Sequence, residues 1–294
     1  MPSWSEILTD VNLFSDVAKE LDKKRKEYLN TIHSITGRNV IAYYSGWLMK
    51  PDAPHVSINE QDKNAFMTAV YKLDKTKGLD LILHTPGGDI AATESIVNYL
   101  KSIFKGDVRA FIPQISMSAG TMIAMSCREI IMGEQSSLGP IDPQIGGIAC
   151  QAVIDEFERA VDEVSKKPSA LGLWQTIISK YHPTFLTTCK NAIAWSTQLA
   201  EQWLKETNPT IDLTKFKDVF FYHEKTYSHS RHISKQACKD VGLNIVDLES
   251  DPNLQDAVLS LHHCYMILFD KFLVSKIVEN NIGGRYVQNY TPKN

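Results

Sequence analysis

The middle of the chain alternates short apolar runs with longer amphipathic segments. Residues 79–84, 108–113 and 129–132 are apolar runs of strand length, whereas residues 59–73 and 90–104 have helical periodicity. Strands that alternate with helices of this length indicate βαβ units, and right-handed crossovers then place the three strands side by side in a mainly parallel sheet. The sequence therefore predicts an α/β fold.

The two ends of the chain have a different pattern. Residues 16–33 are charged, with a sparse apolar stripe, which predicts a helix too polar for the core. Further helices are predicted over 151–165, 170–180, 184–206 and 252–280. We therefore expect an N-terminal helical arm (1–38), an α/β core (39–250) that starts with a strand at 39–47, and a C-terminal helical extension with a tail (251–294).

Composition excludes several classes of protein. The chain has 294 residues and a net charge of −3, which gives no support for a surface that binds nucleic acid or anionic membranes. Its five cysteines form no Cys-x-x-Cys pair, so neither a zinc site nor a disulfide framework is predicted. We expect a cytoplasmic protein with no metal, no cofactor, no signal peptide and no membrane span.

A turn of two glycines follows the strand at 79–84. Residues 85–88 read Thr-Pro-Gly-Gly and precede the helix at 90–104. Consecutive glycines let the backbone turn without a Cβ and let a ligand approach the N–H groups closely. The same residues are also typical of a plain strand-to-helix turn. A dinucleotide site is a poor alternative because Gly-x-Gly-x-x-Gly is absent.

Ser118 stands where a strand meets a helix of small residues. Serine is a favoured helix N-cap, so a purely capping role is one interpretation. The small residues that follow, and the positive end of the helix dipole, favour a second interpretation, in which the hydroxyl is a nucleophile beside an oxyanion site. Ser116, two residues earlier, carries the same chemistry and stays an alternative.

These two segments, with Ser-Leu-Gly-Pro-Ile-Asp-Pro-Gln at 137–144, resemble the Clp protease–crotonase superfamily. The similarity is closest to the serine dehydrogenase proteinase branch, which is related to signal peptide peptidase A and the Clp proteolytic subunit. A weaker match covers residues 230–237 and the Val-Gly-Leu at 241–243. The resemblance spans about residues 39–250 and implies a repeated ββα core.

The resemblance also implies roles for individual residues. Ser118 matches the family nucleophile. The backbone N–H groups that match the oxyanion hole belong to Gly87 or Gly88 and to Ala119. Candidates for the substrate groove are His84, beside the Gly-Gly turn, and two residues of the loop at 133–143, Pro140 and Ile141.

The general base is a histidine or a lysine in relatives of this kind. Residues 142–147, where the Clp subunit pattern would place the histidine, contain none, so a Ser-Lys mechanism is expected. A lysine base needs a lowered pKa, and hence burial away from carboxylates. The candidates, in order, are Lys180, Lys190 and His182, whereas Lys166 and Lys167 lie near acidic residues and are expected to be solvated.

Three functions are compatible with these features. The first is a serine peptidase that acts on peptides or proteins by acyl transfer, which Ser118 and the 137–144 loop favour. The second is a crotonase-like enzyme that binds an acyl-coenzyme A, and the third is a non-catalytic module for assembly or peptide binding. No nicotinamide fingerprint supports serine dehydrogenation. The resemblance also implies a homo-oligomer, with both terminal segments as plausible interfaces, and leaves open a regulatory or ATPase partner.

Overall fold

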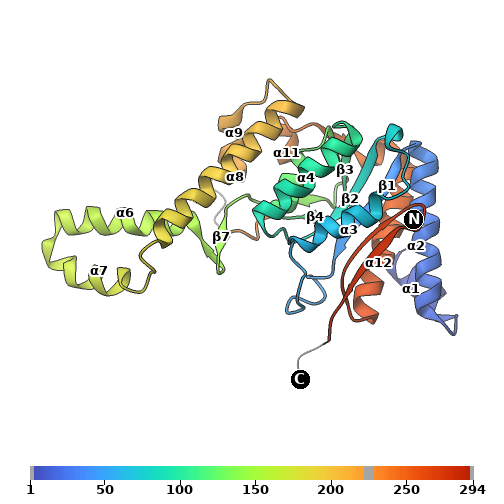
Figure 1. Cartoon of the computed structure of the whole chain (residues 1–294), viewed down its shortest axis with the longest axis horizontal. Coiled ribbons are helices and arrows are strands. Elements are labelled where there is room, and N and C mark those ends of the chain that lie inside the picture. Colours follow the sequence, from blue (N-terminus) through green and yellow to red (C-terminus); the bar gives the residue numbers. More distant parts are fainter. Residues whose placement is uncertain (1–2, 222–227, 292–294) are drawn as a thin grey trace.

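A computed structural model of the chain describes residues 3–221 and 228–291. Within these residues seven strands form the central sheet (Figure 1). Their order across it is β10 (Ile245–Asp247), β5 (Glu129–Met132), β3 (Val108–Ile112), β2 (Leu79–His84), β1 (Asn39–Ser45), β11 (Val274–Asn280) and β12 (Arg285–Asn289). The strands from β10 to β1 are parallel, and β11 and β12 are each antiparallel to the strand before. The predicted α/β fold, with neighbouring parallel strands β2, β3 and β5, is confirmed.

Helices cover both faces of the sheet. Alternate residues of β1 divide between two hydrophobic cores, with Ile41 and Tyr43 in one and Ala42 and Tyr44 in the other. The first core is closed by α3 (Gln61–Val70), α4 (Ile90–Phe104), α5 (Ala119–Met125), α9 (Leu213–Phe220) and the end of α8 (Phe185–Thr207). The second is closed by α2 (Val17–Thr36) and α12 (Pro252–Lys271), with α1 (Trp4–Asn12) beside them. Burial on both faces explains why these strands are continuous apolar runs.

Helix α2, the main helix of the expected N-terminal arm, packs against the core. Leu21, Leu29 and Ile32 of α2 are buried against α12 and the sheet. Arg25, on the same stripe, is only 1% exposed because its Nε bonds Glu279 Oε1 at 2.7 Å. The ion pair with Glu279 allows Arg25 to be buried on the face of α2 that packs against the core. This explains why the sequence of α2 looks too polar for a core helix.

The C-terminal segment corrects the expectation of one helix over 252–280. Helix α12 ends at Lys271, and residues 274–280 form β11, which pairs with β1 inside the sheet. The polar residues of β11 conceal the strand pattern, since Lys276 and Glu279 are buried with ionic partners. The segment therefore completes the core sheet instead of forming a tail.

Short elements frame the carboxyl ends of the parallel strands. Strand β4 (Ile115–Ser116) pairs with β6 (Ser137–Leu138), which pairs with β9 (Ile233–Ser234). Helix α11 (Lys235–Asp240) follows β9, and the 3-10 turns η1 (Lys75–Lys77) and η3 (Leu248–Ser250) connect strands and helices elsewhere. This small sheet brings together three segments that are far apart in the sequence.

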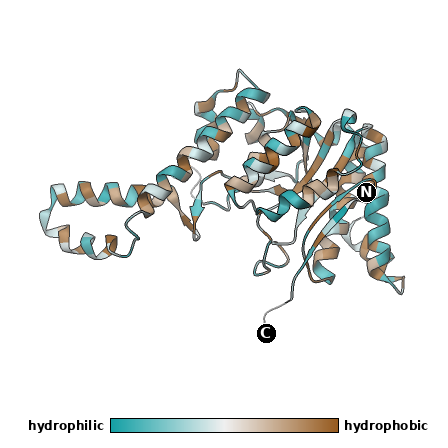
Figure 2. Cartoon of the chain, in the orientation of Figure 1, coloured by the Kyte–Doolittle hydropathy of each residue, from teal (hydrophilic) through white to brown (hydrophobic). Residues whose placement is uncertain are grey.

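An arm projects from the core after residue 143 (Figure 1). A hairpin of β7 (Gln144–Ile145) and β8 (Ile148–Ala149) leads into α6 (Cys150–Lys166), η2 (Pro168–Ala170) and α7 (Leu171–Ile178), and α8 returns to the core. We call α6, η2, α7 and the start of α8 the projecting arm. Figure 2 shows apolar segments along it, and Val161 and Leu173 are 74% and 62% exposed. No described helix combines the length and the hydropathy that crossing a membrane requires.

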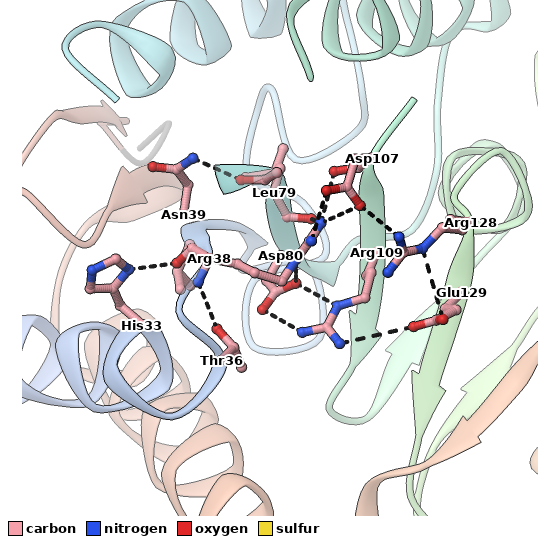
Figure 3. Close-up of polar contacts among 12 residues, drawn as sticks. His33, Thr36, Arg38, Asn39, Leu79, Asp80, Asp107, Arg109, Arg128 and Glu129 are labelled. Atoms are coloured by element: carbon pink, nitrogen blue, oxygen red, sulfur yellow. Dashed lines mark hydrogen bonds and ion pairs between the residues drawn. The ribbon is translucent and has the colours of Figure 1, made fainter. Parts of the chain in front are cut away.

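An ionic network closes the amino ends of the parallel strands (Figure 3). Asp80 of β2 is fully buried and accepts hydrogen bonds from Arg38 Nε and from Arg109 Nε and Nη2, each at 2.8 Å. Arg38 also bonds Asp107. The network links β2 to β3 and to the residue before β1, at the end of the sheet opposite the Gly-Gly turn.

Candidate active site

Ser118 lies in a strained turn between β4 and α5. Its backbone has φ +50° and ψ −117°, a conformation that is uncommon for a residue with a side chain. The residue is half-buried, and its hydroxyl makes no capping hydrogen bond to α5. Ser118 is therefore not a plain N-cap, because its hydroxyl accepts no hydrogen bond from the first turn of α5.

The Gly-Gly turn lies directly against this serine. A Cβ on Gly87, which has φ +91°, would lie 2.8 Å from Ser118 Cβ and 2.9 Å from Ala119 N. A Cβ on Gly88 would lie 2.3 Å from Ile58 O. Glycine at both positions is what allows the turn to fit between Ser118 on one side and Ile58 on the other.

Hydrogen bonds connect the two loops at their base. Met117 N donates to Thr85 O at 2.9 Å, and Thr85 and Ser116 form an isolated parallel bridge. Ser116 itself is fully buried, so its hydroxyl is not exposed for chemistry. Of the two serines, Ser118 is the one at an open surface.

The orientation of the turn distinguishes its two N–H groups. Gly87 N donates to Thr85 Oγ1 at 3.2 Å, and Gly87 O accepts from Ile58 N at 2.7 Å. The peptide is trans, so the Gly88 N–H points opposite to the Gly87 carbonyl and away from Ile58. Ala119 N belongs to the first turn of α5, where N–H groups have no partner within the helix. Gly88 and Ala119 are therefore the better pair of oxyanion donors.

One pocket of about 550 Å³ contains these groups. Ser118, Gly87, Gly88 and Ala119 line it, together with His229. Its walls are largely apolar, from Ile90, Met122, Ile141, Ile145 and Ala192. Asp89, the other ionisable lining residue, accepts a hydrogen bond from Ala92 N at 2.8 Å as the N-cap of α4.

His229 is not among the candidates that the sequence predicts. Its Nδ1 is hydrogen-bonded to Oδ1 of Asp142, a carboxylate only 2% exposed in the 137–144 loop. A carboxylate can only accept, so Nδ1 is the donor in this bond, and in the neutral ring Nε2 is the nitrogen that can accept a proton. The Asp142–His229 pair thus has the chemistry of a base and its orienting carboxylate. Its histidine lines the pocket that holds Ser118.

The expected bases lie elsewhere. Lys180, Lys190 and His182 are exposed on the projecting arm, and none of them lines the pocket with Ser118. Lys190 borders a groove between α6 and α8, and His182 Nδ1 contacts Thr184 Oγ1 at 3.0 Å. The structure does not bring these residues to the nucleophile, because α6 and α7 carry the chain away from the sheet (Figure 1).

Two of the three expected groove residues also lie outside the pocket. His84 is fully buried among Tyr44, Trp47 and His262, and burial holds its pKa well below 6.5. Pro140 is buried and does not line the pocket, whereas Ile141 does. No group of three His, Cys, Asp or Glu side chains suited to a metal ion occurs in the part of the chain that the structure describes.

Comparisons with known proteins identify the family of the chain. A model of the ClpP-like SDH-type serine proteinase family matches residues 9–179. The chain is 27% identical over 209 residues to uncharacterized protein MJ0137 of Methanocaldococcus jannaschii, an alignment that covers 71% of this chain and 65% of that protein. It is 35% identical over 108 residues to uncharacterized protein MJ1495 of the same organism, which covers 37% of each. The chain thus spans less than two thirds of the length of either relative. Because the family match covers more than half of its residues, the chain belongs to the ClpP-like SDH-type serine proteinase family.

Proposed function

We propose that the protein is a serine peptidase that uses Ser118 as nucleophile, His229 as general base and Asp142 as the group that orients the base. The observation that carries this proposal is that Ser118, whose hydroxyl does not cap α5, lines the same pocket as His229, the hydrogen-bond partner of Asp142. A histidine base replaces the lysine expected from the sequence.

The first half of the reaction forms an acyl-enzyme. Ser118 Oγ attacks the carbonyl carbon of the scissile amide while His229 Nε2 takes the hydroxyl proton. The carbonyl oxygen becomes an oxyanion, which the N–H groups of Gly88 and Ala119 stabilise. The C–N bond then breaks, and the imidazolium gives its proton to the departing amine.

The second half repeats these steps with water. His229 Nε2 removes a proton from the water that attacks the ester carbonyl, and Ser118 Oγ leaves with that proton. Asp142 accepts the Nδ1–H bond throughout and stabilises the imidazolium that forms twice per turnover. The hydrogen bond from His229 to Asp142, which is buried in the loop between β6 and β7, fixes the orientation of the ring.

The test is covalent labelling with a fluorophosphonate, which phosphonylates an activated serine. Wild-type protein is expected to label at Ser118, and Ser118→Ala to lose the label completely. His229→Gln and Asp142→Asn are expected to slow labelling by about 10³–10⁴-fold, the scale for triad members. Lys180→Met is the matched control and should label at the wild-type rate. Loss of labelling in Lys180→Met but not in His229→Gln would refute the assignment of the base. Retention of the unlabelled protein on coenzyme A resin would favour the crotonase-like alternative.

We also propose that the projecting arm mediates a homo-oligomer. Val161, Leu171 and Leu173 are exposed on it, and α6 and α7 enclose an apolar groove of about 670 Å³. Apolar surface of this kind is typical of an interface. The terminal segments, which the sequence offers as plausible interfaces, bury apolar residues within the subunit. All five cysteines are free, which suits the cytoplasmic location expected from the sequence.

A further inference from the structure

A buried lysine–aspartate pair lies behind the Gly-Gly turn. Lys276 of β11 and Asp62 of α3 are 1% and 2% exposed, and Lys276 Nζ lies 2.8 and 2.7 Å from the two carboxylate oxygens. Tyr43 donates its hydroxyl to Asp62 Oδ2 at 2.9 Å. Neither charged residue lines the pocket of Ser118. The pair therefore has no direct part in the acyl transfer proposed above.

The pair holds both ends of a three-residue segment, 57–59, which we call the strut. Lys276 Nζ donates to Ser57 O at 2.8 Å, at the beginning of the strut. Asp62 Oδ2 accepts from Asn59 N at 2.9 Å, at its end. One ion pair thus fixes the backbone of the strut at two points.

The middle of the strut supports the turn. Ile58 N donates to Gly87 O at 2.7 Å, and Ile58 O accepts from Asp89 N at 2.9 Å. These two bonds flank the Gly87–Gly88 peptide and fix which way its carbonyl points. Because Gly88 has no side chain to resist rotation, a displaced strut would free this peptide to turn its N–H away from the pocket.

We propose that Lys276 and Asp62 are positioning residues that hold the Gly88 N–H toward the reacting carbonyl by fixing the strut. This inference rests on the proposed peptidase function. An ion pair can fix the strut better than apolar residues would, because it makes directional hydrogen bonds to Ser57 O and from Asn59 N. Stability alone does not account for it, because buried ion pairs are commonly replaced by apolar residues without loss of stability.

The main test is the double variant Lys276→Met/Asp62→Leu, which keeps the volume apolar and is expected to fold. Its rate of labelling at Ser118 by fluorophosphonate-rhodamine should fall at least about tenfold, since loss of one oxyanion donor costs about 10²–10³. With fluorescein-casein, kcat should fall while KM stays near the wild-type value, because the apolar walls are untouched. Asp62→Asn, which preserves shape, is measured beside it and should show a smaller loss in the same direction.

Asp80→Asn is the matched control, because it disrupts a buried ion network on β2 at the opposite end of the sheet (Figure 3). Measured under conditions where thermal unfolding shows it to be folded, its labelling rate should stay within about twofold of wild type. Equal slowing in the control, or an unchanged rate in the folded double variant, would overturn the positioning role.

Amide hydrogen exchange separates this inference from the proposed function. The amides of Ile58 and Asp89 are protected by the strut's bonds, so in both pair variants their exchange should accelerate more than that of core amides, whereas Asp80→Asn should produce no such local difference. If wild-type protein fails to label at Ser118, the proposed function fails. Whether or not the wild type labels, unchanged exchange at Ile58 and Asp89 in the two pair variants would overturn the positioning role.

Discussion

Gly87→Ala should impair the serine chemistry far more than it impairs the fold. The new Cβ would lie 2.7 Å from Met117 O, 2.8 Å from Ser118 Cβ and 2.9 Å from Ala119 N. Carbon contacts are normally about 3.5 Å or longer, so the nucleophile or the turn must move by roughly 0.5–1 Å. A misplacement of that size costs about tenfold to a hundredfold in rate.

Gly106→Ala is the control that separates strain from contact. Gly106 has φ +77°, similar to the +91° of Gly87, but a Cβ at this position would meet nothing within 4 Å. Both variants should therefore lose about 1–2 kcal/mol of unfolding free energy from the backbone conformation alone. Only Gly87→Ala is expected to change the reactivity of Ser118.

The assay is the second-order rate of fluorophosphonate labelling, measured where thermal unfolding shows both variants to be folded. Gly87→Ala should label about tenfold to a hundredfold more slowly than wild type, and Gly106→Ala at the wild-type rate. The reasoning would be refuted if both variants labelled equally, since the contact between the turn and the nucleophile would then have no catalytic consequence.

Three further outcomes are expected. Asp80→Asn should lower the free energy of unfolding by about 3–5 kcal/mol, because it leaves Arg38 and Arg109 beside a neutral group. An unchanged midpoint of urea unfolding would contradict this. Burial lowers the pKa of His262 to about 3, below the ordinary 6.5, so the unfolded chain binds more protons and stability should fall as pH drops from about 6.5 toward 3. His262→Gln should flatten that slope in urea titrations, and an identical slope would exclude His262 as a source. Leu173→Glu should shift the protein toward smaller species in light scattering without altering the labelling of isolated subunits, whereas an unchanged mass would argue against the projecting arm as an interface.

The parallel sheet can be predicted because its determinants are local. Each of β2, β3 and β5 is an apolar run whose period and flanking helices are visible within a few residues. The Gly-Gly turn and Ser118 are visible for the same reason, since each is a contiguous signal at the end of a strand. Strand β11 escapes prediction because Lys276 and Glu279 are compatible with a buried strand only when Asp62 and Arg25 are placed beside them. Those partners come from distant helices, so no window of sequence contains the explanation.

The proposed base, His229, shows the same limit of sequence-based prediction. Asp142 lies in the segment 137–144, which resembles the family motif. Its partner His229 follows the projecting arm in the sequence and directly precedes the weak match at 230–237. A search for a histidine near Ser118 in the sequence cannot find His229, because α6, α7, α8 and α9 lie between the two residues in the chain, whereas both line the same pocket. The sequence favours Lys180 for its non-acidic neighbours, yet lack of nearby acids does not imply burial, and on the arm it is exposed.

A lysine that is buried and has a lowered pKa does exist, in Lys276, where desolvation outweighs the attraction of Asp62. Its three hydrogen-bonding contacts, to Ser57 O and both oxygens of Asp62, commit its ammonium group to the strut. These contacts favour a positioning role for Lys276, and the proposed mechanism assigns the proton of Ser118 to His229.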